Sequence, residues 1–367
     1  MAKMLQINCS GTPHEIGLKH GREAKLQISR SIAFYADLFQ GTAKMDWPKV
    51  QDLAMTFEPV MRRKWPAYLE EIGGEFVTHA TSETMSDDAD WMLGRPGIAE
   101  GAGVSLSDII AINVRTEITF GMFSDGCTAL GWKTRDGSFL AQNWDWMEAQ
   151  KENLIILTIE QQNKPTIKMV TEAGLIGKIG LNSAGVGVCL NAIKVKGMDP
   201  TRIPCHLGLR MVLESGSRDE AVRQLEKYGV ASSCHMLVAD GSGSIGLEWS
   251  AVELQKVKMN GREQVFHSNH YLAEHVGVED SRWLEDSTFR VTKIEKLCED
   301  FKDPPTTETL FELFKDEENY PGAICRAQVG TSGSASLFNI IMDLQHRTAA
   351  VTLGRPVAPE EVVQLAF

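Results

Sequence analysis

The chain has 367 residues, a net charge of −12 and a pI near 5.3, and 43% of its residues are hydrophobic while 23% are charged. This length can bury a large core, and the composition is that of a soluble globular protein. The acidic balance argues against a nucleic-acid partner, because binding phosphates requires a basic face, and no apolar run approaches the ~20 residues that a membrane helix needs.

The first part of the chain is predicted to be helical. Thr12-Pro13-His14-Glu15 forms a capping box with proline at the first helical position, and apolar residues then follow at helical spacing as far as Phe39. Gly17 and Gly21 lie four residues apart on one face, where each costs about 1 kcal/mol relative to alanine. We expect this cost to be offset by close packing of that face against a neighbouring backbone.

A second helical tract is predicted over residues 47–72, with breaks at Pro59 and Pro66, and a third helix is predicted to begin at the Ser105 cap. Residues 73–96 are rich in Thr, Ser, Asp and Gly and have little periodicity. A structureless stretch of this length fits poorly in a compact domain. It is interpreted as an atypical insertion, either a surface loop or a translated intron.

After residue 126 the apolar pattern changes towards the period of two that is typical of strands. A hairpin is predicted about Asp136-Gly137, and further strands and helices follow in alternation to residue 353. Strands in series after helices predict an α+β fold in which sheets pack together with helices outside. The predicted strands are 127–132, 138–143, 154–161, 166–171, 178–181, 186–191, several within 235–272, 337–344 and 348–353, and the predicted helices are 204–214, 218–228, 289–301 and 307–315.

The stretch Asp125-Gly126-Cys127-Thr128 carries the chemistry that we consider most informative. A catalytic thiol needs a base with a pKa near working pH, and an α-amine at roughly 7.7–8.0 meets that need. If the chain cut itself between Gly126 and Cys127, thiol and amine would belong to one residue. Asp145 returns to the start of the first strand after the hairpin and could orient either group. A cysteine beside a turn glycine is more often a small buried hydrophobe, and composition alone favours that interpretation.

Eight short motifs occur in an order that is more specific than any one of them. Together they resemble the fungal isopenicillin N acyltransferases, also called acyl-coenzyme A:6-aminopenicillanic acid acyltransferases. The motifs are GTPHEIGLKHG at 11–21, NVRTE at 113–117, DGCT at 125–128, QNWD at 142–145, KENL at 151–154, TEAGLIGK at 171–178, SNH at 268–270 and ICRA at 324–327.

The resemblance implies a four-layer αββα sandwich of the N-terminal-nucleophile hydrolase type, activated by cleavage between Gly126 and Cys127. By position, it makes Cys127 the nucleophile, Asp145 the residue that orients it, Asn269 the oxyanion partner and Arg326 the pocket arginine. Residues 1–126 would become a helical α chain and residues 127–367 a catalytic β chain, the two staying together as one structural domain. No cofactor or metal is implied, since the coenzyme A thioester is a substrate.

The expected enzyme is an acyltransferase with amidohydrolase activity that exchanges acyl groups between acyl-coenzyme A and a β-lactam amine in penicillin biosynthesis. One departure is the Thr128-Ala129 pair, where the penicillin enzymes have Thr-Thr after the cysteine. Two alternatives stay open: an amide hydrolase with another substrate, and an unprocessed paralogue that binds an acyl ligand without turnover. The mechanistic alternative is a papain-like Cys-His pair in which His267 or His270 is the base for Cys127.

Other patterns are weaker. Seven cysteines without a C-x-x-C pair indicate neither a disulfide framework nor a zinc ribbon, and with no signal peptide and no peroxisomal ending the cytoplasm is the expected compartment. The pairs Cys205-His206 and Cys234-His235 are interpreted as core residues. Residues 241–246 match G-x-G-x-x-G, but a strand is predicted to follow, which favours a hairpin turn over a dinucleotide site.

Overall fold

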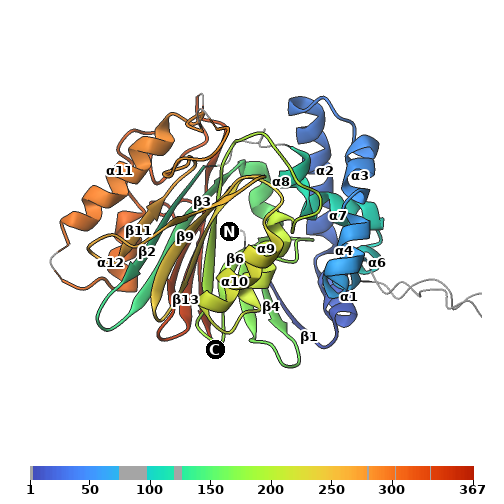
Figure 1. The fold of residues 1–367 in the computed structure, drawn as a ribbon, viewed down its shortest axis with the longest axis horizontal. Helices are drawn as coiled ribbons and strands as arrows, with labels where there is room; N and C mark the ends of the chain where they lie inside the picture. The colour runs from blue at the N-terminus through green and yellow to red at the C-terminus, as the bar shows by residue number, and fades with distance from the viewer. Residues whose placement is uncertain (1–2, 74–96, 120–125, 279–280, 302, 331) are drawn as a thin grey trace, which may run out of the picture.

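The computed structural model describes residues 3–73, 97–119, 126–278, 281–301, 303–330 and 332–367. Two β-sheets pack face to face, with helices on both outer sides (Figure 1). The predicted α+β four-layer sandwich is therefore confirmed. All of the proposed insertion except Gly73 lies outside the described residues.

The six-stranded sheet holds the hairpin that was predicted from the Asp136-Gly137 turn. Its strand order is β11-β2-β3-β12-β13-β14, and all of its pairings are antiparallel. Along the chain, the strands are β2 (Gly126–Lys133), β3 (Ser138–Trp146), β11 (Gln264–His267), β12 (Ala335–Asp343), β13 (Thr348–Leu353) and β14 (Glu361–Ala366).

The eight-stranded sheet has the order β1-β4-β5-β6-β7-β8-β9-β10. Its first strand, β1, was not predicted, and it pairs parallel to β4. The G-x-G-x-x-G motif at residues 241–246 covers the turn between β8 and β9 and the start of β9, so the hairpin interpretation is confirmed. The strands are β1 (Leu5–Ser10), β4 (Leu154–Glu160), β5 (Ile167–Glu172), β6 (Ile179–Asn182), β7 (Gly187–Ala192), β8 (Cys234–Asp240), β9 (Gly243–Trp249) and β10 (Leu254–Val257).

The N-terminal helices form a group beside the eight-stranded sheet, on the right in Figure 1. The predicted capping box at Thr12 is present, but the first predicted helix is divided into two at Ala24. The helices are α1 (Pro13–Glu23), α2 (Lys25–Thr42), α3 (Trp47–Met55), α4 (Glu58–Lys64), α5 (Pro66–Gly73), α6 (Ile98–Ala102), α7 (Leu106–Asn113) and α8 (Arg115–Ile118).

Close backbone packing explains the two glycines of α1. A Cβ at Gly17 would lie 2.0 Å from the carbonyl oxygen of Glu71, and one at Gly21 would lie 2.3 Å from that of Ile98. Because both neighbours are backbone atoms, neither could move aside cheaply, so only glycine fits. The predicted close approach is confirmed.

Two further helix pairs complete the layers. Helices α9 (Cys205–Leu213) and α10 (Arg218–Tyr228) contact the eight-stranded sheet, and α11 (Asp286–Glu299) and α12 (Thr307–Leu313) cover the six-stranded sheet. The short 3₁₀ helix η2 (Glu148–Asn153) links β3 to β4.

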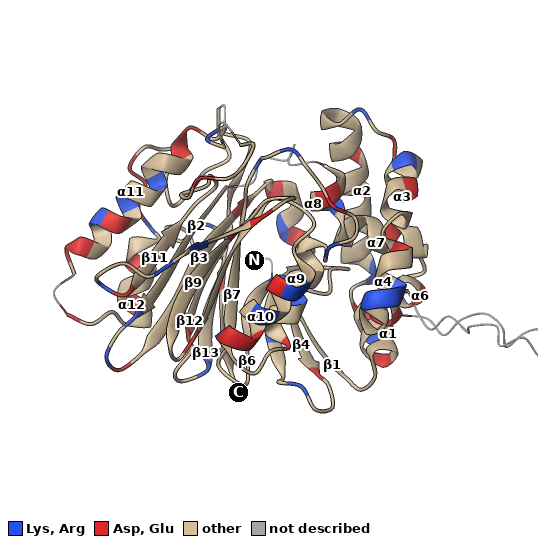
Figure 2. Cartoon of the chain, viewed as in Figure 1, with Lys and Arg blue, Asp and Glu red and all other residues tan. Residues whose placement is uncertain are grey.

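Apolar burial is divided between two clusters. A large core joins both sheets to the N-terminal helices, and a smaller one, which includes Leu130, Ile294 and Phe314, lies under α11 and α12. In the view of Figure 2, Lys, Arg, Asp and Glu are interspersed over helices and loops while the strands are mostly uncharged. None of the helices that the structure describes has the length and apolar character needed to cross a bilayer.

Candidate active site

The β2–β3 hairpin brings Cys127 and Asp145 to the same end of the six-stranded sheet. Gly126 pairs with Asp145, and Cys127 pairs with Trp144. The predicted return of Asp145 to the start of the first strand is therefore confirmed. Cys127 and Asp145 are both fully buried.

Polar groups from two other elements hold the backbone of Cys127. Its N–H donates to Oδ1 of Asn269 at 2.8 Å, just after the end of β11. Its carbonyl oxygen accepts hydrogen bonds from Oγ of Ser268 at 2.9 Å and from Nη1 of Arg290 on α11 at 2.5 Å. The strand that carries the thiol is thus fixed on both sides of Cα.

The orientation of the Asn269 amide follows from its neighbours. Oδ1 also accepts from Nη2 of Arg290 at 2.9 Å, and because a guanidinium can only donate, the atom facing it must be the amide oxygen. Nδ2 donates to the carbonyl oxygen of Ala192 at 3.0 Å. An amide nitrogen carries two hydrogens, so one bond to Ala192 leaves a second N–H that could serve a substrate oxygen.

Asp145 has an unusual carboxylate environment. Oδ1 accepts from Oγ of Ser336 at 2.6 Å, whereas Oδ2 is buried and has no hydrogen-bond partner among the described residues. Burial raises the pKa of Asp145 from 3.8 to about 6, although Arg290 and Arg326 act in the opposite direction. A Cβ at Gly126 would lie only 2.8 Å from Oδ2, so this oxygen lies directly beside the predicted cleavage site.

Two arginines share one aspartate next to this carboxylate. Nη1 and Nη2 of Arg326 bind the two oxygens of Asp286 at 2.9 and 2.8 Å, and Nη2 of Arg290 binds Oδ1 of Asp286 at 2.9 Å. Burial would raise the pKa of Asp286, but both arginines outweigh it and hold that pKa below its usual value. The cluster places positive charge beside Gly126, since Nη1 of Arg326 would lie 3.3 Å from a Cβ there.

All four site residues predicted from the sequence come together. The structure adds Arg290, Asp286, Ser268 and Ser336, which sequence reasoning missed. The i, i+4 spacing of Asp286 and Arg290 predicts that they face each other on a helix, but nothing in the sequence indicates that this face meets Cys127.

The histidines of the alternative Cys-His mechanism have other partners. Nε2 of His267 lies 2.7 Å from Oε1 of Glu248, and its Nδ1 lies 2.8 Å from the carbonyl oxygen of Ser268. Nδ1 of His270 lies 2.7 Å from Oγ of Ser287, and burial lowers the pKa of His270 to about 4. With both ring nitrogens of His267 engaged and His270 a weak base, this geometry favours neither as a base for Cys127.

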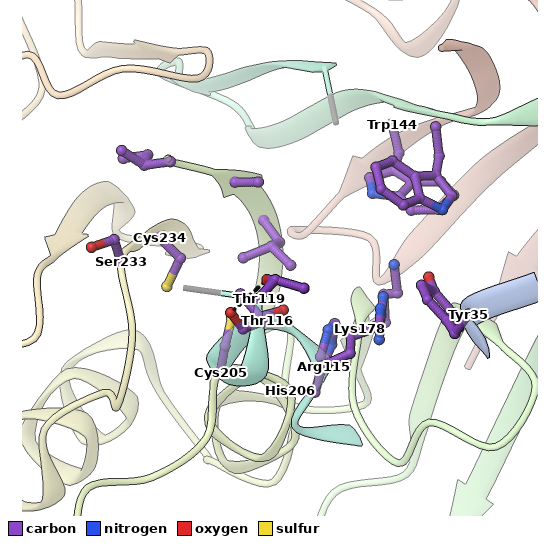
Figure 3. Close-up of a pocket in the computed structure, with 14 residues that line it drawn as sticks. Tyr35, Arg115, Thr116, Thr119, Trp144, Lys178, Cys205, His206, Ser233 and Cys234 are labelled. Atoms are coloured by element: carbon purple, nitrogen blue, oxygen red, sulfur yellow. Dashed lines mark hydrogen bonds between the residues drawn. The ribbon is translucent and has the colours of Figure 1, made fainter. Parts of the chain in front are cut away.

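A cavity with about 40 Å³ of free volume is lined by residues of both sheets and of helices α2, α8 and α9 (Figure 3). Its lining includes Trp144, which pairs with Cys127 in the sheet, and Ala192, whose carbonyl binds Asn269. The lining also includes Arg115 and Lys178, which both donate to Glu172 at 2.5 Å. The cavity therefore joins aromatic surface near the thiol to a buried group of charges.

The Glu172 carboxylate is the centre of that group. Tyr35 and Gln150 also donate to it, Gln150 at 3.0 Å. Burial would raise the pKa of Glu172, but Arg115 and Lys178 outweigh it and hold that pKa well below its usual value. Lys178 also lies 3.8 Å above the ring of Trp144, so it links the charges to the aromatic wall.

No group of three or more His, Cys, Asp or Glu side chains among the described residues could hold a metal ion. In the two Cys-His pairs, Nδ1 of His206 contacts the carbonyl oxygen of Gly177, and Cys205 lies against Cys234 in the core. The core interpretation of the two Cys-His pairs is in line with their full burial.

A buried cysteine at the start of a central strand, beside a carboxylate and two arginines in a four-layer sandwich, is the arrangement of a candidate cysteine-dependent enzyme site. Residues 132–358 match the family described as acyl-coenzyme A:6-aminopenicillanic acid acyl-transferase. The chain is also 40% identical, over 99% of its length and 96% of the relative's, to the 40 kDa form of acyl-coenzyme A:6-aminopenicillanic-acid-acyltransferase from Emericella nidulans. The chain therefore belongs to the acyl-coenzyme A:6-aminopenicillanic acid acyltransferase family.

Solved structures give more distant matches. A C2A mutant of the conjugated bile acid hydrolase from Clostridium perfringens is 14% identical, with a TM-score of 0.47 over 66% of this chain and 92% of the other. Penicillin V acylase from Agrobacterium tumefaciens is 13% identical, with a TM-score of 0.43 over 66% of this chain and 86% of the other.

Proposed function

We propose that this protein is a self-cleaving cysteine acyltransferase that moves acyl groups between acyl-coenzyme A and the amine of 6-aminopenicillanic acid. The observation that carries the proposal is the setting of Cys127, which is buried at the start of β2. Its N–H donates to the side-chain oxygen of Asn269, and the carboxylate of Asp145 lies beside the preceding residue, Gly126. The 40% identity to the Emericella nidulans enzyme supports the same activity and a place in penicillin biosynthesis.

Self-cleavage begins with attack of the Cys127 thiol on the carbonyl carbon of Gly126. The peptide C–N bond breaks as the C–S bond forms, the nitrogen gains a proton, and water then hydrolyses the thioester to free the Gly126 carboxylate. The α-amine does not exist before this step, so another group must accept the thiol proton. Asp145 suits that role, because Oδ2 makes no hydrogen bond within the described residues and the pKa is about 6.

After cleavage, the new α-amine becomes the base for turnover. Asn269 Oδ1 accepts from this nitrogen in the uncut chain and would keep it beside the thiol. Cys127 then attacks the acyl thioester, coenzyme A leaves with a proton, and the acyl-enzyme passes its acyl group to an amine or to water. The second N–H of Asn269 and the positive charge of Arg326 would stabilise the oxyanion, an interaction whose loss typically costs about 2.7–4 kcal/mol of barrier.

The cavity beside Trp144 is the natural place for the acyl chain. It is lined by residues of both sheets and of helices α2, α8 and α9, and its wall includes Trp144, the strand partner of Cys127. Its free volume in the uncut chain is smaller than ligand pockets usually are. Substrate binding would therefore need the cavity to widen after cleavage.

The two fragments are expected to remain together as a heterodimer. Strand β1 from the first fragment is paired along its whole length with β4 of the second. Ion pairs also join the two fragments, one between Glu71 and Arg210 at 2.9 Å and one between Arg115 and Glu172 at 2.5 Å. All seven cysteines are free and buried, which supports a reducing compartment such as the cytosol.

The test is to incubate the purified protein with a labelled acyl-coenzyme A and 6-aminopenicillanic acid. The proposal predicts acyl transfer to the amine and loss of both transfer and hydrolysis in Cys127→Ala. Release of free acid without any N-acyl product would favour the amide-hydrolase alternative. An intact chain without turnover would favour the non-catalytic paralogue, for which Ala129 in place of a second threonine and the insertion at 73–96 are the motivating features.

A further inference from the structure

A buried carboxylate fastens the segment that carries Asn269 to the opposite sheet. Glu248 is on β9 of the eight-stranded sheet, and it is fully buried. Its Oε1 lies 2.7 Å from Nε2 of His267 and accepts the N–H of Leu272 at 2.6 Å. Its Oε2 accepts the N–H of Ala273 at 3.0 Å and lies 3.3 Å from Nε2 of His275. One carboxylate thus holds the chain on both sides of Asn269.

The two ring nitrogens of His267 define its protonation state. Nδ1 faces the carbonyl oxygen of Ser268 at 2.8 Å and Nε2 faces the Glu248 carboxylate at 2.7 Å, so each nitrogen faces an acceptor. A neutral imidazole has a single N–H and would leave one of these contacts as two facing lone pairs. Burial would raise the pKa of Glu248, but its hydrogen-bond partners outweigh burial and hold that pKa well below its usual value, so the carboxylate can only accept. With an ionised Glu248, both contacts are satisfied only when both nitrogens carry hydrogen, which makes the ring an imidazolium.

The surroundings of His267 support a charged ring at this position. His235 of β8 stacks on it with ring centroids 3.4 Å apart and an angle of 11° between the planes. Burial holds the pKa of His235 well below its usual value, so the stacked neighbour is neutral and presents a π face to the cation. The other charged or titratable groups nearby are Glu248, His275, His270 and Arg290 of α11, a helix that packs against β11, and of these Glu248 is the one that forms an ion pair with His267.

The position of this pair connects it to the nucleophile. His267 is the last residue of β11 and pairs with Ala129, two residues after Cys127. Its Nδ1 binds the Ser268 carbonyl, and the next residue, Asn269, accepts the N–H of Cys127. A shift of this turn would move the amide that positions the α-amine.

We propose that His267 is a permanent imidazolium, paired with Glu248, and that the pair acts as a positioning device for Asn269 and the nitrogen of Cys127. The kinetic part of this inference rests on the proposed acyl transfer, whereas the protonation of His267 does not. Neither residue touches the reacting atoms, so both are positioning residues. Without the Glu248 carboxylate, the His267 ring would carry a single N–H at neutral pH. One of its two hydrogen-bond contacts would then be lost.

The first test measures the ring directly in the unmodified protein. Nitrogen-15 NMR of histidine-labelled protein, with the His267 signals assigned by comparison with His267→Gln, should show both ring nitrogens protonated from pH 5.5 to 8. A His267 ring with one bare nitrogen at pH 7 would overturn the proposal, whatever the enzyme does with substrates.

The second test uses Glu248→Gln, with Glu253→Gln as the matched control. Glu253 makes the same kind of contact with His275, at 3.6 Å, but is partly exposed and does not touch His267. Glu248→Gln should lower kcat by about 10²-fold at pH 8 with little change in KM, because small misplacements in a site have effects of that size. The loss should shrink towards pH 5.5, because a higher proton concentration favours the doubly protonated ring even without the carboxylate.

The control should keep wild-type kcat at every pH. A loss in Glu248→Gln that is the same at pH 5.5 and pH 8 would show that the carboxylate only supports the fold, and would contradict the proposal. If no acyl transfer is found in the wild type, the NMR result still decides the protonation of His267 and separates this inference from the proposed function.

Discussion

The carboxylate of Asp145 lies directly against Gly126, since a Cβ on residue 126 would come within 2.8 Å of Oδ2. This contact joins the residue before the nucleophile to a buried acid whose pKa is raised to about 6. It also explains why the residue before Cys127 has no side chain.

Substitution Gly126→Ala should slow or abolish self-cleavage. The added methyl group would meet Oδ2 of Asp145 at 2.8 Å and Cδ of Arg326 at 3.2 Å, so the strand or the carboxylate must shift away from its position. The fraction of cut chain on a denaturing gel over time measures the effect. Gly261→Ala is the control, because a Cβ there meets nothing within 4 Å. Equal cleavage rates in the two variants would argue against the role of this contact.

The pH dependence of self-cleavage should follow the ionisation of the Asp145 carboxyl. Its pKa of about 6 means that the carboxylate is ionised and able to accept a proton above pH 6, and protonated below it, so the cleavage rate of freshly made precursor should fall as pH drops through 6. Asp145→Asn should lose about 10²-fold or more in rate and show no such decline. Asp136→Asn, in the turn of the same hairpin and 83% exposed, serves as the control. A wild-type profile that is flat between pH 5 and 8 would exclude Asp145 as the base.

Arg290→Met should impair both folding stability and cleavage. Arg290 is fully buried and binds the Cys127 carbonyl, the Asn269 amide and Asp286, so its loss leaves buried acceptors unsatisfied. Breaking a buried ion pair typically costs about 3–5 kcal/mol, which chemical denaturation can measure. Lys296→Met, at an exposed position on the same helix, should change stability by less than about 1 kcal/mol. Wild-type stability and cleavage in Arg290→Met would refute the assigned contacts.

The Glu172 cluster should give the protein an acid-sensitive stability. The pKa of Glu172 is held below its usual value, so its contribution is present above the unfolded pKa near 4.3 and is lost as pH falls below that value. Glu172→Gln should lower the free energy of unfolding at pH 7 by about 3–5 kcal/mol, and the difference from the wild type should narrow in acid. Denaturation at pH 7 and pH 3.5 tests this. Glu160→Gln, at an exposed end of β4, should have no comparable effect.

Local patterns predicted most of the fold. The β2–β3 hairpin follows from its turn residues and alternation, and α1 follows from its capping box. Strand β1 was missed because its pairing is parallel and remote, with Leu5 opposite Ile155. Strand β14 was missed because it is a mostly exposed edge strand without a clear apolar alternation. The break at Ala24 was missed because nothing in the helical pattern of residues 12–39 marks a helix end there.

The residues of the site also fall into those that local sequence patterns indicate and those that depend on contacts between distant segments. Cys127 and Asp145 could be proposed from a turn glycine, a thiol and a hairpin, whereas Asn269 and Arg326 were indicated only by family motifs. Arg290 could not be found, since its function depends on which face of α11 meets the first residues of β2. Such contacts between distant segments have no periodic signal in the sequence.

The most direct test of the account is to determine the N-terminal sequences and intact masses of enzyme that is competent for turnover. We predict two polypeptides, residues 1–126 and residues 127–367, the second beginning with Cys127, and a single uncut chain for Cys127→Ala. Active enzyme that contains no polypeptide beginning at residue 127 would contradict the central claim.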